Sequence, residues 1–159
     1  MRRRSVAASG SRSTRIPFAT EQVIALGKSL GGGIASELAL RERIGALVLQ
    51  STFTSIPDVG AEIFPWLPVR RLHSIKYDTV NKLPRIEAPV LIVHSRADGL
   101  IRFHHAEKNF AAAREPKMFL EIAGNHTNVL EVDREQYLAG LEGFLRRHFN
   151  HHAPPVSNE

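Results

Sequence analysis

The chain has 159 residues, of which 43% are hydrophobic and 23% charged, as expected for one globular domain with a single core. It contains no cysteine, which excludes disulfides, thiol catalysis and thiolate metal sites. No apolar run is long enough to span a bilayer. The net charge is +5, and the excess lies in residues 1–15, which hold five arginines and no acid. The remaining chain is neutral by formal count, which argues against a nucleic-acid-binding face on the domain.

Residues 1–20 lack an apolar period and are predicted to be a disordered basic tail. We interpret this tail as a remnant N-terminus joined to a truncated domain, in a cytoplasmic protein. Two other interpretations stay open. An Arg- and Ser-rich start without acids resembles an organelle transit peptide, and it could also be a basic arm for acidic surfaces. Residues 150–159 are predicted to be a second disordered tail.

Apolar runs predict strands over residues 22–26, 46–50, 89–94 and 118–122. Helices are predicted over 30–42, 59–64, 103–113 and 131–148, the last with the clearest apolar stripe. Continuous apolar strands that alternate with helices indicate an α/β fold, with a mostly parallel sheet of about four strands and flanking helices. The domain is expected to span residues 21–149, with a Pro-rich, lid-like insertion at 51–88.

The first predicted strand turns into the first predicted helix through Gly27-Lys28-Ser29-Leu30-Gly31. A Ser at a sharp strand-to-helix turn with Gly on both sides is a nucleophile elbow. We expect Ser29 to be strained, and we expect a Cβ at Gly27 or Gly31 to collide with the neighbouring strand or helix. A Gly-rich turn could instead cradle a phosphate, but the frame of a P-loop is absent around Lys28.

A serine hydroxyl needs a base to accept its proton and an acid to orient that base. In a parallel sheet such groups come from loops at the carboxyl ends of strands. Asp98 follows the third predicted strand and His126 follows the fourth. The order Ser29, Asp98, His126 is therefore the order of a Ser…Asp…His triad.

Other residues compete for these roles. His94 lies at a strand end, where a structural role is the more common one, and His104 and His105 lie at a helix start, which disfavours the charged imidazolium. Asp78 and Asp133 are alternative acids, but neither follows a predicted strand directly.

The chain resembles the α/β-hydrolase superfamily over residues 21–147, in its dienelactone-hydrolase-like or serine-aminopeptidase-like branch. The matching stretches are 27–32, 47–53, 88–94, Asp98 and 124–126. The resemblance implies that Ser29 is the nucleophile, His126 the base and Asp98 its orienting acid. It also implies hydrolysis of an ester, a thioester or a small amide without a metal or an organic cofactor. The Leu30 amide is the oxyanion donor that the elbow provides.

The sequence departs from that superfamily in three places. Ser95 stands where the family often has Gly, and Arg102 stands where a Pro is frequent. The family's sheet begins with several strands before the elbow, which also supply the second oxyanion donor, and none is recognisable here. We therefore expect a truncated fold whose residues 22–26 form an exposed apolar edge that invites self-association. A non-catalytic fragment is the alternative interpretation.

Three aromatic residues are candidates for the substrate pocket. Phe53, Phe64 and Trp66 lie in the predicted lid-like insertion, where they could line an acyl pocket. An ordinary place in the core is an equally good interpretation of these residues.

Overall fold

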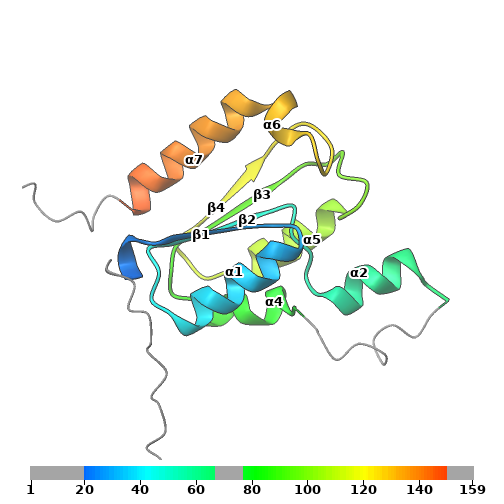
Figure 1. Ribbon diagram of the computed structural model, residues 1–159, viewed down its shortest axis with the longest axis horizontal. Coiled ribbons are helices and arrows are strands. Elements are labelled where there is room, and N and C mark those ends of the chain that lie inside the picture. The colour runs from blue at the N-terminus through cyan, green and yellow to red at the C-terminus, as the bar shows by residue number, and fades with distance from the viewer. Residues whose placement is uncertain (1–19, 67–76, 150–159) are drawn as a thin grey trace, which may run out of the picture.

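Parallel strands in the order β1-β2-β3-β4 form one sheet in the computed structural model, which describes residues 20–66 and 77–149 (Figure 1). The middle strands are mostly apolar, and β2 and β3 are buried along their whole length. The register aligns Gly27, Leu49, Ile92 and Phe119 in one row across the sheet. The strands are β1 (Ile24–Lys28), β2 (Ala46–Gln50), β3 (Val90–His94) and β4 (Lys117–Glu121). The predicted fold class is confirmed.

Helices cover both faces of this sheet. Below it in Figure 1 lie α1 (Leu30–Arg41), α4 (Thr79–Lys82) and α5 (Phe103–Ala112), and above it lies α7 (Arg134–His148). The shorter elements are α2 (Ile56–Ile63), α6 (Val129–Val132) and the 3-10 turns η1 (Thr20–Gln22) and η2 (Leu83–Arg85). None of the helices in the described ranges combines the length and apolar character needed to cross a bilayer.

Alternation along β2 divides the core into two layers. Leu47 and Leu49 pack with the α1 and α5 side, whereas Ala46 and Val48 pack with Tyr137 and other residues on the α7 side. Since side chains of a strand alternate between faces, the continuous apolar run in this strand supplies both layers at once.

Two predicted elements need correction. The first strand spans 24–28 rather than 22–26, because residues 20–22 form a 3-10 turn and the strand continues through Gly27 and Lys28, which pair with β2. The last helix is not continuous over 131–148. It is interrupted at Asp133, whose φ of −136° and ψ of 41° are not helical.

The segment 51–88 contains more regular structure than its prolines suggest. Helix α2 begins after Ser55, whose hydroxyl accepts a hydrogen bond from Asp58 N at 3.2 Å, and Pro57 lies in its first turn, where no donor is required. The central part of this predicted lid, and both predicted tails apart from Thr20, lie outside the described residues. The lid role stays a prediction.

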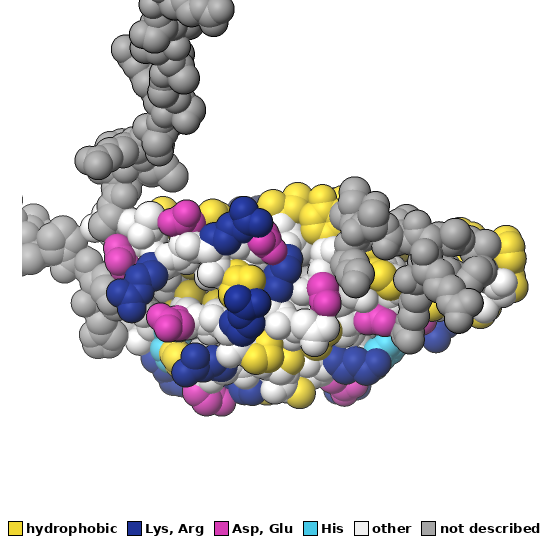
Figure 2. Space-filling model, turned by 90° about the horizontal axis from the view of Figure 1, so that it is seen from below, with side chains coloured by type: hydrophobic (Ala, Val, Ile, Leu, Met, Phe, Trp, Pro, Cys, Tyr) yellow, Lys and Arg dark blue, Asp and Glu magenta, His cyan; other side chains and the backbone are white. Residues whose placement is uncertain are grey.

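Figure 2 views the molecule from below the sheet and shows basic and acidic side chains interspersed over the described part of this face. Glu37 pairs with Arg41 Nε at 2.7 Å and with Lys82 Nζ at 2.8 Å. A surface of mixed sign does not favour a polyanionic partner here.

Candidate active site

Ser29 is the single residue between the end of β1 and the start of α1. Its φ of 52° and ψ of −119° are rare for a residue with a Cβ, so the backbone is strained as predicted. Two main-chain bonds hold this turn in place. Ser29 N donates to Gln50 O at 2.9 Å, and Gly32 N donates to Ser29 O at 3.0 Å.

The glycines around the elbow differ in how much space surrounds them. A Cβ on Gly27 would lie 2.5 Å from Gly31 O and 2.6 Å from Gly32 Cα, so the close approach of β1 and α1 requires glycine. The same expectation was wrong for Gly31, where an added Cβ meets no atom within 4 Å. The crowded positions in the helix are Gly32, against the side chain of Thr52, and Gly33, against Tyr77.

His126 joins the other two residues that the sequence singles out. Its Nδ1 lies 2.8 Å from Asp98 Oδ2, and its Nε2 lies 3.1 Å from Ser29 Oγ. Ser29 follows β1, Asp98 follows β3 and His126 follows β4, so all three lie at the carboxyl ends of strands, as the topology predicts. Leu30 is the first residue of α1, so its N–H is one of those that an α-helix leaves without an internal acceptor.

Asp98 is held by its own loop. Its side chain is buried, and Oδ1 accepts hydrogen bonds from Leu100 N at 3.0 Å and Ile101 N at 2.9 Å, which leaves Oδ2 for His126. His94 Nε2 lies 2.8 Å from Ile101 O and fastens the far end of this loop to β3. Two amide donors fix the direction of this carboxylate, which is what an orienting acid requires.

The loop that carries His126 is fixed in a similar way. Asn125 Oδ1 accepts from Thr127 N at 2.9 Å and Asn128 N at 3.1 Å, while Asn128 Oδ1 accepts from Asn125 N at 2.7 Å. Ser95 Oγ donates to Gly124 O and so ties this loop to the end of β3. The Ser at position 95 thus has a structural use that a Gly would lack.

The competing residues occupy other places. His94 is buried beneath the Asp98 loop, Asp78 caps α4 by accepting from Asn81 N, and Asp133 Oδ2 accepts from Ala123 N at 2.7 Å. His104 and His105 both face Glu62 of α2, with Nε2 to Oε1 distances of 2.8 and 3.3 Å.

His94 gives the fold a pH dependence. Burial is the main cause that lowers the pKa of His94 from its ordinary value of 6.5; the Ile101 carbonyl and Asp98 act in the opposite direction. The ring is therefore neutral when folded but binds a proton when unfolded, so its contribution to stability is complete above pH 6.5 and falls as the solution is acidified. Below pH 6.5 the slope that this one group adds is at most about 1.4 kcal/mol per pH unit.

The measurement is urea unfolding at several pH values between 5 and 8, on the natural chain and on His94→Gln. Glutamine can still donate to Ile101 O but does not titrate, so the free energy of unfolding of the variant should depend less steeply on pH. Equal slopes in the two proteins would mean that His94 does not titrate between the folded and unfolded states.

The three aromatic candidates do not gather in one place. Phe53 is buried in the interior, whereas Phe64 and Trp66 are 47% and 78% exposed. The two exposed rings contact each other edge-on, with centroids 6.2 Å apart. Their role as pocket lining stays a prediction.

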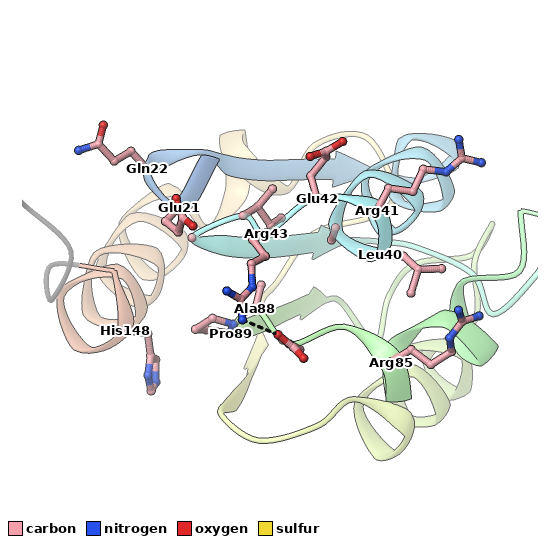
Figure 3. Close-up of a pocket in the computed structure, with 14 residues that line it drawn as sticks. Glu21, Gln22, Leu40, Arg41, Glu42, Arg43, Arg85, Ala88, Pro89 and His148 are labelled. Atoms are coloured by element: carbon pink, nitrogen blue, oxygen red, sulfur yellow. Dashed lines mark ion pairs between the residues drawn. The ribbon is translucent and has the colours of Figure 1, made fainter. Parts of the chain in front are cut away.

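A cavity of about 790 Å³ lies at the opposite end of the sheet. Figure 3 shows that η1, the end of α1 and the segments leading into β2 and β3 line it. Arg43 and Glu87 form an ion pair at 3.6 Å on its rim. Because this cavity lies at the amino ends of the strands, Ser29, Asp98 and His126 have no part in it.

Several known proteins are similar to this chain in sequence. An uncharacterized protein of Mycobacterium tuberculosis is 37% identical over 120 residues, covering 75% of this chain and 43% of that protein. The human alpha/beta hydrolase domain-containing protein 17B is 31% identical over 133 residues, covering 83% and 44%. No protein-family model matches the sequence.

Solved structures agree on the fold. The esterase domain of a Rhodothermus marinus protein has a TM-score of 0.60 at 19% identity, covering 79% of this chain and 60% of that one. The acylaminoacyl peptidase of Pyrococcus horikoshii has a TM-score of 0.65 at 12% identity, covering 87% and 26%.

A parallel sheet with a strained serine after a strand, and with His and Asp loops beside it, defines the class of α/β-hydrolase folds. Over the described residues the chain has an α/β-hydrolase fold, and proteins similar to it in sequence include alpha/beta hydrolase domain-containing proteins. It spans about half the length of the curated relatives it matches, with shares of 43% to 50%. The particular branch stays a prediction.

The structural role expected for His94 at its strand end agrees with the structure, where its bond to Ile101 holds the Asp98 loop. Sequence reasoning missed the convergence of Glu62 with His104 and His105. The adjacent histidines could have suggested a ligand pair, but nothing in the sequence points to Glu62 as their neighbour.

Proposed function

We propose that the chain is a serine hydrolase that cleaves an ester or a thioester, with a small amide as a further substrate class. The single observation that carries this proposal is the position of His126, within hydrogen-bond distance of both Ser29 Oγ, at 3.1 Å, and Asp98 Oδ2, at 2.8 Å. A serine at a strained elbow with such a base beside it is arranged for nucleophilic attack.

The reaction follows from the donors and acceptors. Ser29 Oγ attacks the substrate carbonyl carbon as its proton passes to His126 Nε2, and Asp98 stabilises the imidazolium that forms. The Leu30 N–H donates to the oxyanion. His126 then gives the proton to the leaving alcohol, thiol or amine, and the acyl group remains on Ser29. A water molecule then attacks the acyl carbon as its proton passes to His126 Nε2; the bond from that carbon to Ser29 Oγ breaks, His126 returns the proton to Oγ, and the acid leaves.

The test combines labelling and turnover. We expect a fluorophosphonate probe to label the chain on Ser29 and p-nitrophenyl acetate or butyrate to be hydrolysed, because both reagents need an activated serine. Ser29→Ala should lose the label while remaining folded by circular dichroism. Labelling that persists in Ser29→Ala, or no labelling of folded protein, would overturn the proposal.

A second candidate rests on the sheet edge. Among the described strands β1 pairs with β2 alone, and its Leu26 is 51% exposed. A stripe on α1, made of Leu30, Ile34 and Leu38, is also exposed. We propose that a second copy of the chain covers this edge. In this alternative the chain is a non-catalytic fragment that acts by association. An open strand with apolar side chains is a template for such pairing.

This association predicts a charge-sensitive oligomer. Leu26→Lys places an ammonium group on the edge, so the substituted chain should be monomeric at concentrations where the natural chain dimerises. Sedimentation velocity of both proteins measures this, with Leu138→Lys on α7 as the control for an equally exposed leucine elsewhere. A natural chain that stays monomeric, or the same dimer in Leu26→Lys, would remove this candidate.

A further inference from the structure

Three metal-ligating side chains converge where the end of α2 meets the start of α5. Glu62 lies in the last turn of α2, and His104 and His105 lie in the first turn of α5. The ligand atoms lie within 4.8 Å of one another. Glu62 Oε1 is 2.8 Å from His104 Nε2 and 3.3 Å from His105 Nε2. Donors at 2.0 to 2.2 Å from one tetrahedral zinc ion lie about 3.3 Å apart, so these separations suit a shared cation.

His105 supplies an independent reason to expect a ligand. Its side chain is 1% exposed, and its Nε2, which faces Glu62, has no hydrogen-bond partner among the described residues. A buried polar atom without a partner is costly, and native proteins rarely leave one in that state. One carboxylate oxygen already occupied by His104 is a poor partner for a second imidazole. A cation between the three residues would use all three lone pairs.

Thr54 contacts the ring nitrogen of His105 that points away from Glu62. The Thr54 hydroxyl lies 3.0 Å from His105 Nδ1 and donates to Asp58 Oδ2 at 2.8 Å, so its oxygen can accept a hydrogen bond from Nδ1–H. That tautomer frees Nε2 for a metal. Thr54 N, at 3.2 Å from Nδ1, offers a donor to the opposite tautomer when no metal is bound. A hydroxyl and a carboxylate behind a ligating histidine orient the ring and raise its basicity.

The surroundings leave an opening for the ion. The side chains of Glu62 and His104 are 25% and 35% exposed, so a cation can enter from solvent. Arg102 Nε lies 3.9 Å from the other carboxylate oxygen, Oε2, which favours ligation through Oε1 alone. Two imidazoles and one carboxylate then leave a fourth tetrahedral position for water.

We propose that Glu62, His104 and His105 form a binding site for a divalent first-row transition metal, zinc above all, that fastens α2 to the start of α5. Mixed nitrogen and oxygen ligands select such ions over magnesium or calcium, which prefer oxygen alone. The site is separate from Ser29, Asp98 and His126, and it does not depend on the proposed hydrolase chemistry.

The test must remove one competitor, because the sequence near the C-terminus contains His151 and His152, a pair that can chelate metals by itself. We would measure Zn²⁺ by calorimetry and Co²⁺ by visible absorption on the full chain carrying His151→Asn and His152→Asn. We expect one ion per chain and the intense absorption of tetrahedral cobalt. Zinc should also raise the melting temperature, because it binds the folded state.

Matched variants in that background then identify the ligands. Glu62→Gln and His104→Asn should each weaken zinc binding by about 100-fold or more, and Thr54→Val by about 10- to 100-fold. Glu107→Gln, an exposed acid on the same helix, should leave the affinity unchanged. Circular dichroism checks that each variant is folded. The proposal is overturned if the tail substitutions alone abolish binding, or if Glu62→Gln binds zinc as tightly as its parent.

Discussion

Ser29→Ala is expected to lower kcat on p-nitrophenyl butyrate by about 10⁶-fold, and adding His126→Ala should cost almost nothing further. The reason is the shared proton. His126 Nε2 lies 3.1 Å from Ser29 Oγ, so the base has no task without the hydroxyl, and the hydroxyl is a poor nucleophile without the base. Asp98→Asn should be milder, at about 10⁴-fold, because it keeps the geometry but favours the wrong tautomer of His126.

The measurement is the steady-state turnover of Ser29→Ala, of His126→Ala, of the variant with both substitutions, and of Asp98→Asn. Asp78→Asn is the matched control, since this carboxylate caps α4 and contacts none of the three residues in any described hydrogen bond. It should leave kcat unchanged. Losses that multiply in the double variant would show that Ser29 and His126 act independently, and a large loss in Asp78→Asn would transfer the acid role to that residue.

The approach of Asp98 and His126 to Ser29 could be predicted because the three residues lie at positions that topology fixes. In a parallel sheet the carboxyl ends of all strands share one edge, so a residue just after a strand is near any other such residue. That argument brought Asp98 and His126 together across 28 positions of sequence, and the structure places their side chains 2.8 Å apart. It needed only the strand ends, and those of the third and fourth strands were predicted to within one residue.

Contacts made by the surface of a helix could not be predicted from the positions of the strand ends. The motif spacing gave Gly31 and Gly27 equal weight, but only Gly27 meets neighbouring backbone, and the crowded helical positions are Gly32 and Gly33. Which side of α1 faces the strand depends on how the chain leaves the strained serine. Glu62 is similar, because its approach to His105 depends on how α2 packs beside α5.

The two elbow glycines give the prediction with the largest expected effect on stability. Gly27→Ala should lower the free energy of unfolding by about 3 kcal/mol, because the new Cβ meets main-chain atoms that cannot rotate away. Those atoms are Gly31 O at 2.5 Å and Gly32 Cα at 2.6 Å. To relieve the contact, β1 and α1 must separate, and that movement displaces Ser29 between them. The loss of stability should therefore come with a loss of fluorophosphonate labelling.

Gly31→Ala is the control within the same motif. Its Cβ meets no atom within 4 Å, and alanine favours the helical backbone, so stability should rise by about 0.5 kcal/mol. The Leu30 amide and the Ser29 turn are untouched, so labelling should persist. Urea unfolding of both variants against the natural chain measures the difference. Equal destabilisation by the two substitutions would mean that the elbow needs glycine for backbone freedom at both positions, and that the close approach of β1 to α1 is not the constraint.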